Sequence, residues 1–182
     1  TNDFLVEADA FMFAGSRPNV WPEDLCARLC NEAFKKNIPI MADYHGKDLL
    51  MTLSICTPTI IKINEEEFCG TFGFVFPLAE DELIKKIQQK SIELNNIIVV
   101  TRGVKDTIAS ERGTMYRELV TPIQAVNTIG CGDSFTAGFL YTWLKTKDCA
   151  QALKNGGWCA LKNAMNPRPG SIKDSDCEGE TI

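Results

Sequence analysis

The sequence lacks the ligands that most small metal-binding domains need. It has one histidine, His45, and no pair of cysteines spaced Cys-X-X-Cys. Of its eight cysteines, only Cys26 and Cys30 lie close together. Structural zinc sites use four Cys or His ligands, usually in closely spaced pairs. The cysteines therefore predict neither a zinc site nor a disulfide scaffold, and they favour the reduced thiols of a cytoplasmic protein.

The sequence also lacks a long apolar segment and an excess of positive charge. Its longest nearly apolar run, 135–144, is broken by two threonines and reaches about half of the ~20 residues that cross a bilayer. Nineteen Lys and Arg residues against 24 Asp and Glu residues leave a net charge of −5, which repels a phosphate backbone. We therefore expect neither a membrane span nor a nucleic acid partner.

The pattern of the chain predicts an α/β fold. With 45% hydrophobic and 24% charged residues, the 182-residue chain has the composition of one globular domain. Continuous apolar strands alternate with helices, which is typical of a parallel sheet covered on both faces. We expect a three-layer αβα sandwich with a mostly parallel, Rossmann-like sheet over residues 1–172, followed by a polar tail at 173–182. The strands are expected at 8–14, 38–42, 59–63 and 97–101, the helices at 22–34, 47–53, 65–69 and 80–94, a hairpin at 106–120, and two closing helices that end near 164.

The most informative segment precedes the first closing helix. It reads Asn-Thr-Ile-Gly-Cys-Gly-Asp-Ser-Phe over residues 127–135. Two glycines that flank a small residue at a helix start let backbone N–H groups approach an anion, and the helix dipole adds positive potential. Asp133 falls in the first helical turn, where a carboxylate is placed to accept a hydroxyl proton during phosphoryl transfer. The alternative is that Asp133 is only a helix cap.

This segment resembles the signature of the ribokinase or PfkB-type carbohydrate kinases, whose usual form is Asp-Thr-x-Gly-Ala-Gly-Asp. The resemblance implies that Gly130, Cys131 and Gly132 supply an anion hole and that Asp133 is the catalytic base. Cys131 replaces the usual alanine. Asn127 replaces the first aspartate, a change that is familiar from the branch acting on hexose phosphates.

A second segment resembles the same branch. Residues 62–68, Lys-Ile-Asn-Glu-Glu-Glu-Phe, are similar to its Lys-Pro-Asn-x-x-Glu-Leu motif. The resemblance implies that Lys62 and Asn64 approach the nucleotide phosphates and that Glu67 helps to hold Mg²⁺ through water. Glu65 and Glu66 are expected to form a solvated face. The alternative is that Asn64 is only the cap of a solvated acidic turn.

Two further matches concern the nucleotide. Thr101-Arg102-Gly103 resembles the family's Ser/Thr-x-Gly loop, which implies that Thr101 and Gly103 lie near the nucleotide, although Asp106 stands where the family has a further glycine. Asn163 is implied to lie near the adenine pocket, and the alternative is a simple C-terminal helix cap. His45 occupies a position where serine is usual and is expected to be an inert polar residue.

The resemblance as a whole implies an enzyme with a ribokinase-like fold. It implies ATP-dependent phosphorylation of a sugar hydroxyl, with a hexose phosphate such as fructose phosphate or tagatose 6-phosphate favoured, and with ATP, Mg²⁺ and a monovalent cation as cofactors. The family's sugar-binding strands and lid have no counterpart before Ala8, so residues 1–172 are expected to be the C-terminal nucleotide-binding and catalytic portion, with homodimerisation in the full-length protein. The alternatives are a kinase of an unphosphorylated sugar or nucleoside, and a truncated, non-catalytic nucleotide-binding half.

Overall fold

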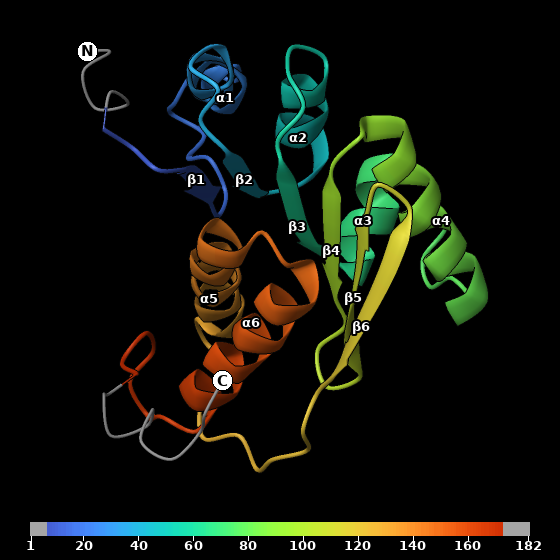
Figure 1. Ribbon diagram of the computed structural model, residues 1–182, viewed down its shortest axis with the longest axis vertical. Helices are drawn as coiled ribbons and strands as arrows, with labels where there is room; N and C mark the ends of the chain where they lie inside the picture. The colour runs from blue at the N-terminus through green and yellow to red at the C-terminus, as the bar shows by residue number, and fades with distance from the viewer. Residues whose placement is uncertain (1–6, 173–182) are drawn as a thin grey trace. The chain divides into compact units, whose positions relative to one another are not determined.

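A computed structural model describes residues 7–172, which form helices and strands in the alternating order that the sequence predicts (Figure 1). The tail predicted at 173–182 lies outside the described residues. The elements are β1 (Phe11–Ala14), α1 (Leu25–Lys35), β2 (Ile40–Asp43), α2 (Gly46–Leu53), β3 (Ile60–Asn64), α3 (Glu65–Phe72), α4 (Glu80–Leu94), β4 (Ile97–Thr101), β5 (Asp106–Glu111), β6 (Thr114–Leu119), α5 (Cys131–Thr146) and α6 (Cys149–Ala164).

The six strands form one sheet in the order β1-β2-β3-β4-β5-β6. The first four are parallel, and Met41, Ile60 and Ile97 are paired in register across β2, β3 and β4. A two-residue turn with positive φ at Arg112 (48°) and Gly113 (95°) joins β5 to β6, which is the geometry that a tight antiparallel hairpin requires. The mostly parallel sheet and the predicted hairpin are both confirmed.

Both faces of the central strands are buried. On one face, alternate strand residues pack against helix residues in a single core cluster. Its members on β2, β3 and β4 are Ile40, Ala42, Ile61, Ile63, Ile98 and Val100, and its helix members include Cys30, Leu49, Phe68, Leu83 and Ile87. Met41, Ile60 and Val99 point to the opposite face and are 0% exposed. This double burial is the physical reason that the strands read as continuous rather than alternating apolar runs.

The chain divides into two compact units. Unit 1 runs through Gly103 and includes Ile108–Tyr116, and unit 2 comprises Val104–Thr107 and the chain from Arg117 onward. Unit 1 therefore holds β1 to β4 with their four helices, and unit 2 holds α5 and α6. None of the helices within residues 7–172 is both long and apolar enough to cross a membrane.

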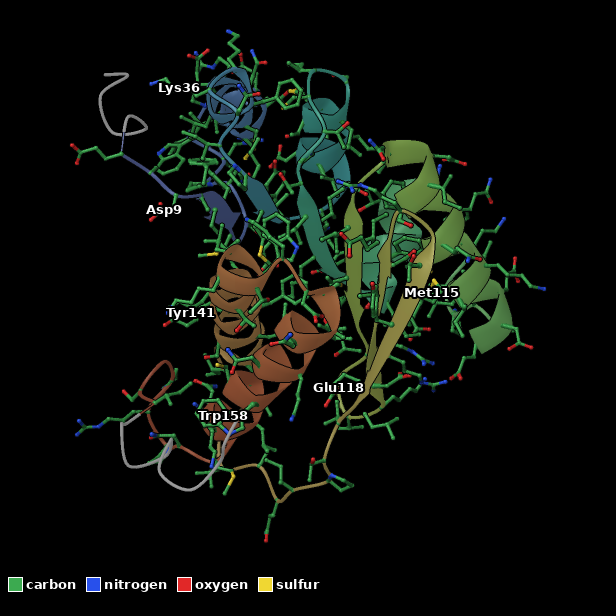
Figure 2. The ribbon with its side chains drawn as sticks, in the orientation of Figure 1. Asp9, Lys36, Met115, Glu118, Tyr141 and Trp158 are labelled. Carbon is green, nitrogen blue, oxygen red and sulfur yellow. The ribbon has the colours of Figure 1, made fainter. Side chains whose placement is uncertain are left out.

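The two helices of unit 2 pack side by side at very short range (Figure 1). The Cα of Gly138 on α5 faces α6 so closely that a Cβ there would lie 2.5 Å from the Sγ of Cys159 and 3.1 Å from the carbonyl oxygen of Asn155. The side-chain amide of Asn155 donates to the carbonyl of Gly138 (3.2 Å) and to the hydroxyl of Thr142 (2.7 Å). On α5, Tyr141 points away from the helix and is 58% exposed (Figure 2).

A chain of hydrogen bonds crosses the core of unit 1. The hydroxyl of Thr52 donates to the carbonyl of Asp48 (3.0 Å), the hydroxyl of Tyr44 lies 2.8 Å from Thr52 Oγ1, and the thiol of Cys30 lies 3.2 Å from Tyr44 Oη. Burial raises the pKa of Cys30 to about 12 and also raises the pKa of Tyr44. Each of the seven cysteines within residues 7–172 is a free thiol.

Helix α1 begins later than its sequence predicts. A helix from Pro22 was expected because proline and acidic residues favour a first turn. Instead the N–H of Leu25 donates to the carbonyl of Pro22 (3.1 Å) in a separate turn, and Asp24 becomes the N-cap residue. The helical turn expected at 65–69 extends to Phe72, where Gly73 ends it with a left-handed φ of 75°.

Candidate active site

The predicted nucleotide-binding residues of unit 1 lie together at the carboxyl ends of neighbouring strands. Asn64 is the last residue of β3 and is paired in register with Thr101, the last residue of β4. Lys62 lies two residues before Asn64 on the same strand, and Gly103 lies two residues after Thr101. Ligands of parallel α/β sheets bind outside this edge. The topology therefore brings four residues from two separate sequence matches together within unit 1.

The ammonium group of Lys62 is held by Asp43, the last residue of β2. Lys62 Nζ lies 3.0 and 3.2 Å from the two carboxylate oxygens of Asp43. Only 10% of the Lys62 side chain and 12% of the Asp43 side chain are exposed. Asp43 is not among the site residues predicted from the sequence. An acidic residue at the end of an apolar strand was the one feature of the sequence that could have indicated it. Which lysine it pairs with depends on the order of the strands in the sheet.

Asn64 and Glu67 form a reciprocal capping box at the start of α3. The Oδ1 of Asn64 accepts from the N–H of Glu67 (2.8 Å), and the Oε2 of Glu67 accepts from the N–H of Asn64 (2.8 Å). Asn64 is therefore the N-cap residue of α3. The box leaves the side-chain amide nitrogen of Asn64 and the Oε1 of Glu67 outside it, and this Oε1 lies 3.6 Å from the Nε2 of His45.

Arg102 ties the loop after β4 to two helices. Its guanidinium donates to Glu65 on α3 (3.1 Å) and to Glu80 on α4 (3.0 Å), and only 4% of its side chain is exposed. The prediction that Glu65 is solvated is therefore wrong: a buried arginine from another strand end draws it inward, so 12% of its side chain is exposed. These pairs hold the loop just before Gly103, whose φ of 64° suits glycine.

In unit 2, a glycine forms the N-cap of α5. Gly130 has a φ of 77°, and its carbonyl accepts the first helical hydrogen bond from the N–H of Ser134 (2.9 Å). Because glycine has no side chain, it supplies no capping oxygen for the N–H groups of the first turn. We call residues Gly130–Gly132 the glycine turn. It has the local structure of an anion-binding helix N-terminus.

Asp133 is exposed on the first turn of α5, immediately after the glycine turn. Its carboxylate makes no hydrogen bond or ion pair with any residue that the structure describes. The alternative that Asp133 caps the helix is wrong, since Gly130 occupies the cap position. A carboxylate in this place is open to a ligand at the glycine turn.

Asn163 lies in the last turn of α6 and is 0% exposed. Its side-chain nitrogen donates to the carbonyl of Ile129 (2.9 Å) and to the Sγ of Cys131 (3.2 Å), and its Oδ1 accepts from the N–H of Gly170 (2.7 Å). Met165 is the C-cap residue of α6, so the alternative that Asn163 is a simple helix cap is wrong. The structure brings Asn163 to the glycine turn within unit 2.

The donor set fits a magnesium ion that is bound mainly by ligand and water. Within residues 7–172, no three or more His, Cys, Asp or Glu side chains cluster as metal ligands. Mg²⁺ usually keeps several waters and takes one or two carboxylates together with substrate phosphates. The Oε1 of Glu67, which the capping box leaves outside, is a hard oxygen donor of the required kind.

A match to a family model shows the protein family to which this chain belongs. The family model for pfkB family carbohydrate kinases matches residues 1–171. The chain belongs to the pfkB family. The matched span includes the residues at the ends of β3 and β4 and the glycine turn.

Solved structures share the fold of this pfkB chain. Phosphofructokinase-2 from Escherichia coli, in complex with potassium, superposes with a TM-score of 0.83 at 17% identity over 96% of this chain. A protein described as "possible 1-phosphofructokinase" from Thermotoga maritima gives 0.81 at 20% identity over 96%, and adenosine kinase from Sinorhizobium meliloti gives 0.72 at 16% over 94%. The chain spans 58%, 55% and 54% of these three structures, respectively. The predicted ribokinase-like α/β fold is confirmed.

Proposed function

We propose that this chain carries the nucleotide-binding and catalytic residues of an ATP-dependent sugar kinase. One observation carries the proposal: α5 begins at a glycine that offers no side-chain cap, and its first turn presents an exposed carboxylate, Asp133. An anion-binding turn beside a proton acceptor is what phosphoryl transfer to a hydroxyl group needs.

The residues of unit 2 take the chemical roles. The N–H groups of Gly130, Cys131 and Gly132 stabilise negative charge on the transferring phosphoryl oxygens. Asp133 accepts the proton of the attacking hydroxyl group. The carboxylate forms no hydrogen bond with another residue in 7–172, which supports this role, because a general base must present its oxygens to the substrate.

The residues of unit 1 take the nucleotide-binding roles. Lys62 neutralises phosphate charge, and the side-chain amide of Asn64 donates to a phosphate oxygen. Thr101 and Gly103 line the nucleotide beside them. Glu67 holds Mg²⁺ through water, and the ion would supply charge neutralisation at the phosphates. The potassium complex of the Escherichia coli enzyme supports a monovalent cation as an additional cofactor.

We propose a phosphorylated ketohexose, such as fructose phosphate or tagatose 6-phosphate, as the acceptor. Asn127 and the Lys62-x-Asn64 motif resemble the hexose-phosphate branch, and two of the similar structures are described as phosphofructokinases. The similarity to adenosine kinase keeps an unphosphorylated sugar or nucleoside as the second candidate.

The test is ATP consumption by the protein at its natural length, assayed with fructose 1-phosphate, fructose 6-phosphate, tagatose 6-phosphate, ribose and adenosine. We expect turnover with one of the three hexose phosphates. Turnover only with ribose or adenosine would support the second candidate. Nucleotide binding without turnover on any acceptor would contradict the kinase and favour a non-catalytic nucleotide-binding role.

A further inference from the structure

The side chain of Asn163 uses its hydrogen-bonding groups inside unit 2. An asparagine amide has two N–H donors and one carbonyl acceptor. One donor reaches the carbonyl of Ile129 and the other reaches the Sγ of Cys131, while the acceptor takes the N–H of Gly170. Both N–H donors of Asn163 are thus used in hydrogen bonds within the protein. Because Asn163 is also 0% exposed, its side chain presents neither a donor nor an acceptor to the edge of a nucleotide base.

The contact with Ile129 fixes the direction of a glycine-turn amide. The carbonyl of Ile129 and the N–H of Gly130 belong to one planar trans peptide, so they point in opposite directions. Because Asn163 draws the carbonyl toward α6, the N–H of Gly130 is aimed away from Asn163. Gly130 also packs closely against this part of unit 2, since a Cβ on Gly130 would lie 3.4 Å from Pro169 and 3.7 Å from Asn163 Oδ1.

The contact with Cys131 fixes the side chain within the turn. Its sulfur accepts from Asn163 (3.2 Å), and its thiol lies 3.8 Å from the carbonyl of Asn127, to which it donates. The next residue of α6 holds the preceding segment, because the carbonyl of Ala164 accepts from the N–H groups of Val126 (2.8 Å) and Asn127 (3.1 Å). The end of α6 therefore fastens the segment leading into α5 at several points.

We propose that Asn163 is a positioning residue for the glycine turn and acts on phosphate recognition through that turn, without contacting the adenine base. The inference rests on the proposed nucleotide-binding function and assigns Asn163 a different role from the one that the family resemblance implies. It predicts that loss of Asn163 weakens the binding of the phosphates and leaves the binding of the nucleoside unchanged.

The test separates the two ends of the nucleotide in the protein at its natural length. Calorimetry measures affinities for ATP, for tripolyphosphate, which has no base, and for adenosine, which has no phosphate. Hydrogen–deuterium exchange of residues 128–133 reports on the turn itself. For Asn163→Ala we expect affinity for tripolyphosphate and ATP to fall about ten- to hundredfold, adenosine to change less than about twofold, and exchange at the turn to accelerate.

Two further variants keep the test decisive. Asn163→Asp has the same shape and keeps the acceptor for Gly170 but loses both donors, so we expect the same selective loss even if the alanine variant folds poorly. Asn155→Ala is the matched control. Asn155 is also buried on α6 and also donates to α5, but at Gly138 and Thr142 rather than at the glycine turn. We expect Asn155→Ala to lower thermal stability without a selective loss of affinity for tripolyphosphate.

The outcomes distinguish this inference from the proposed function. Loss of adenosine affinity with unchanged tripolyphosphate affinity in Asn163→Ala would mean a base contact and would overturn the inference alone. Equal losses of tripolyphosphate affinity in Asn163→Ala and Asn155→Ala would mean that Asn163 has only a packing role. This result would also overturn the inference. A wild-type protein that binds neither ATP nor tripolyphosphate would contradict the proposed function, and the inference with it.

Discussion

Lys62 on β3 and Asp43 on β2 form an ion pair at 3.0 and 3.2 Å in which only about a tenth of each side chain is exposed. The pair lies at the edge of unit 1 where Asn64 and Thr101 end their strands. With so little solvent around them, the two charges stabilise each other, because their mutual attraction offsets part of the cost of removing them from water. The pair therefore couples the stability of unit 1 to the placement of the ammonium group that we assign to phosphate binding.

We expect Lys62→Met to lower the free energy of unfolding by about 3–5 kcal/mol, because it removes the ammonium group that pairs with the largely buried carboxylate of Asp43. The double variant Lys62→Met/Asp43→Leu should recover most of this loss while remaining defective in ATP binding. Urea denaturation and calorimetry measure the two effects. If the double variant bound ATP as tightly as the wild type, Lys62 would have no role at the phosphates.

We expect Asp133→Asn to fold as the wild type and to lose at least about a hundredfold in kcat, because the amide keeps the shape of the side chain but accepts no proton. Thermal melts should coincide, since Asp133 has no hydrogen bond to lose among the described residues. Steady-state kinetics on the natural-length protein measures the effect, with Ser134→Ala on the same turn as the control. Retention of more than about a tenth of the wild-type rate would remove Asp133 from its proposed role.

Two helical glycines of unit 2 should respond in opposite ways to alanine. Gly138→Ala places a Cβ 2.5 Å from Cys159 Sγ and 3.1 Å from a backbone oxygen of α6, so we expect a loss of about 1–3 kcal/mol in the free energy of unfolding. A Cβ on Gly157 meets only Glu118, at 3.6 Å. Gly157→Ala should therefore be neutral or stabilise by up to about 1 kcal/mol, because alanine is the better helix former. Denaturant titration measures the free energy of unfolding of both variants. Equal changes in the two variants would contradict the close packing of α5 on α6 at Gly138.

We expect the chain to lose stability above about pH 9, partly through Cys30. Burial raises the pKa of Cys30 from 9.0 to about 12 in the folded protein. Below pH 9 the thiol is protonated in both states and has no effect on the pH dependence. Between pH 9 and 12 the unfolded chain releases this proton and the folded chain does not, so stability falls by up to about 1.4 kcal/mol per pH unit.

The measurement for Cys30 is urea denaturation at pH 8, 9, 10 and 10.5, compared with Cys30→Ala. The variant is less stable at pH 8 because it loses the packing and the contact with Tyr44. Its decline with pH should be shallower than that of the wild type. Parallel declines would show that Cys30 ionises equally in both states.

The glycine turn was the part of the site that the sequence predicted best, because its chemistry is local. Two glycines, a small residue and a helix start lie within a few residues of each other, so their spacing alone sets the backbone. The capping box of Asn64 and Glu67 was predictable in part for the same reason, since it spans only one turn of α3. The start of α1 was not, because a turn at Pro22 competed successfully with the first turn of the helix.

The sequence by itself determined the α/β class, the mostly parallel sheet and the glycine turn at the start of α5, because these follow from apolar runs and from residues adjacent in the chain. Only the tertiary structure decided the partners of the charged and polar side chains. Asp43 meets Lys62, Arg102 draws in Glu65, and Asn163 reaches Ile129 across 34 positions. A buried polar group must be paired, but the chain offers many candidate partners, and strand order and helix packing select among them.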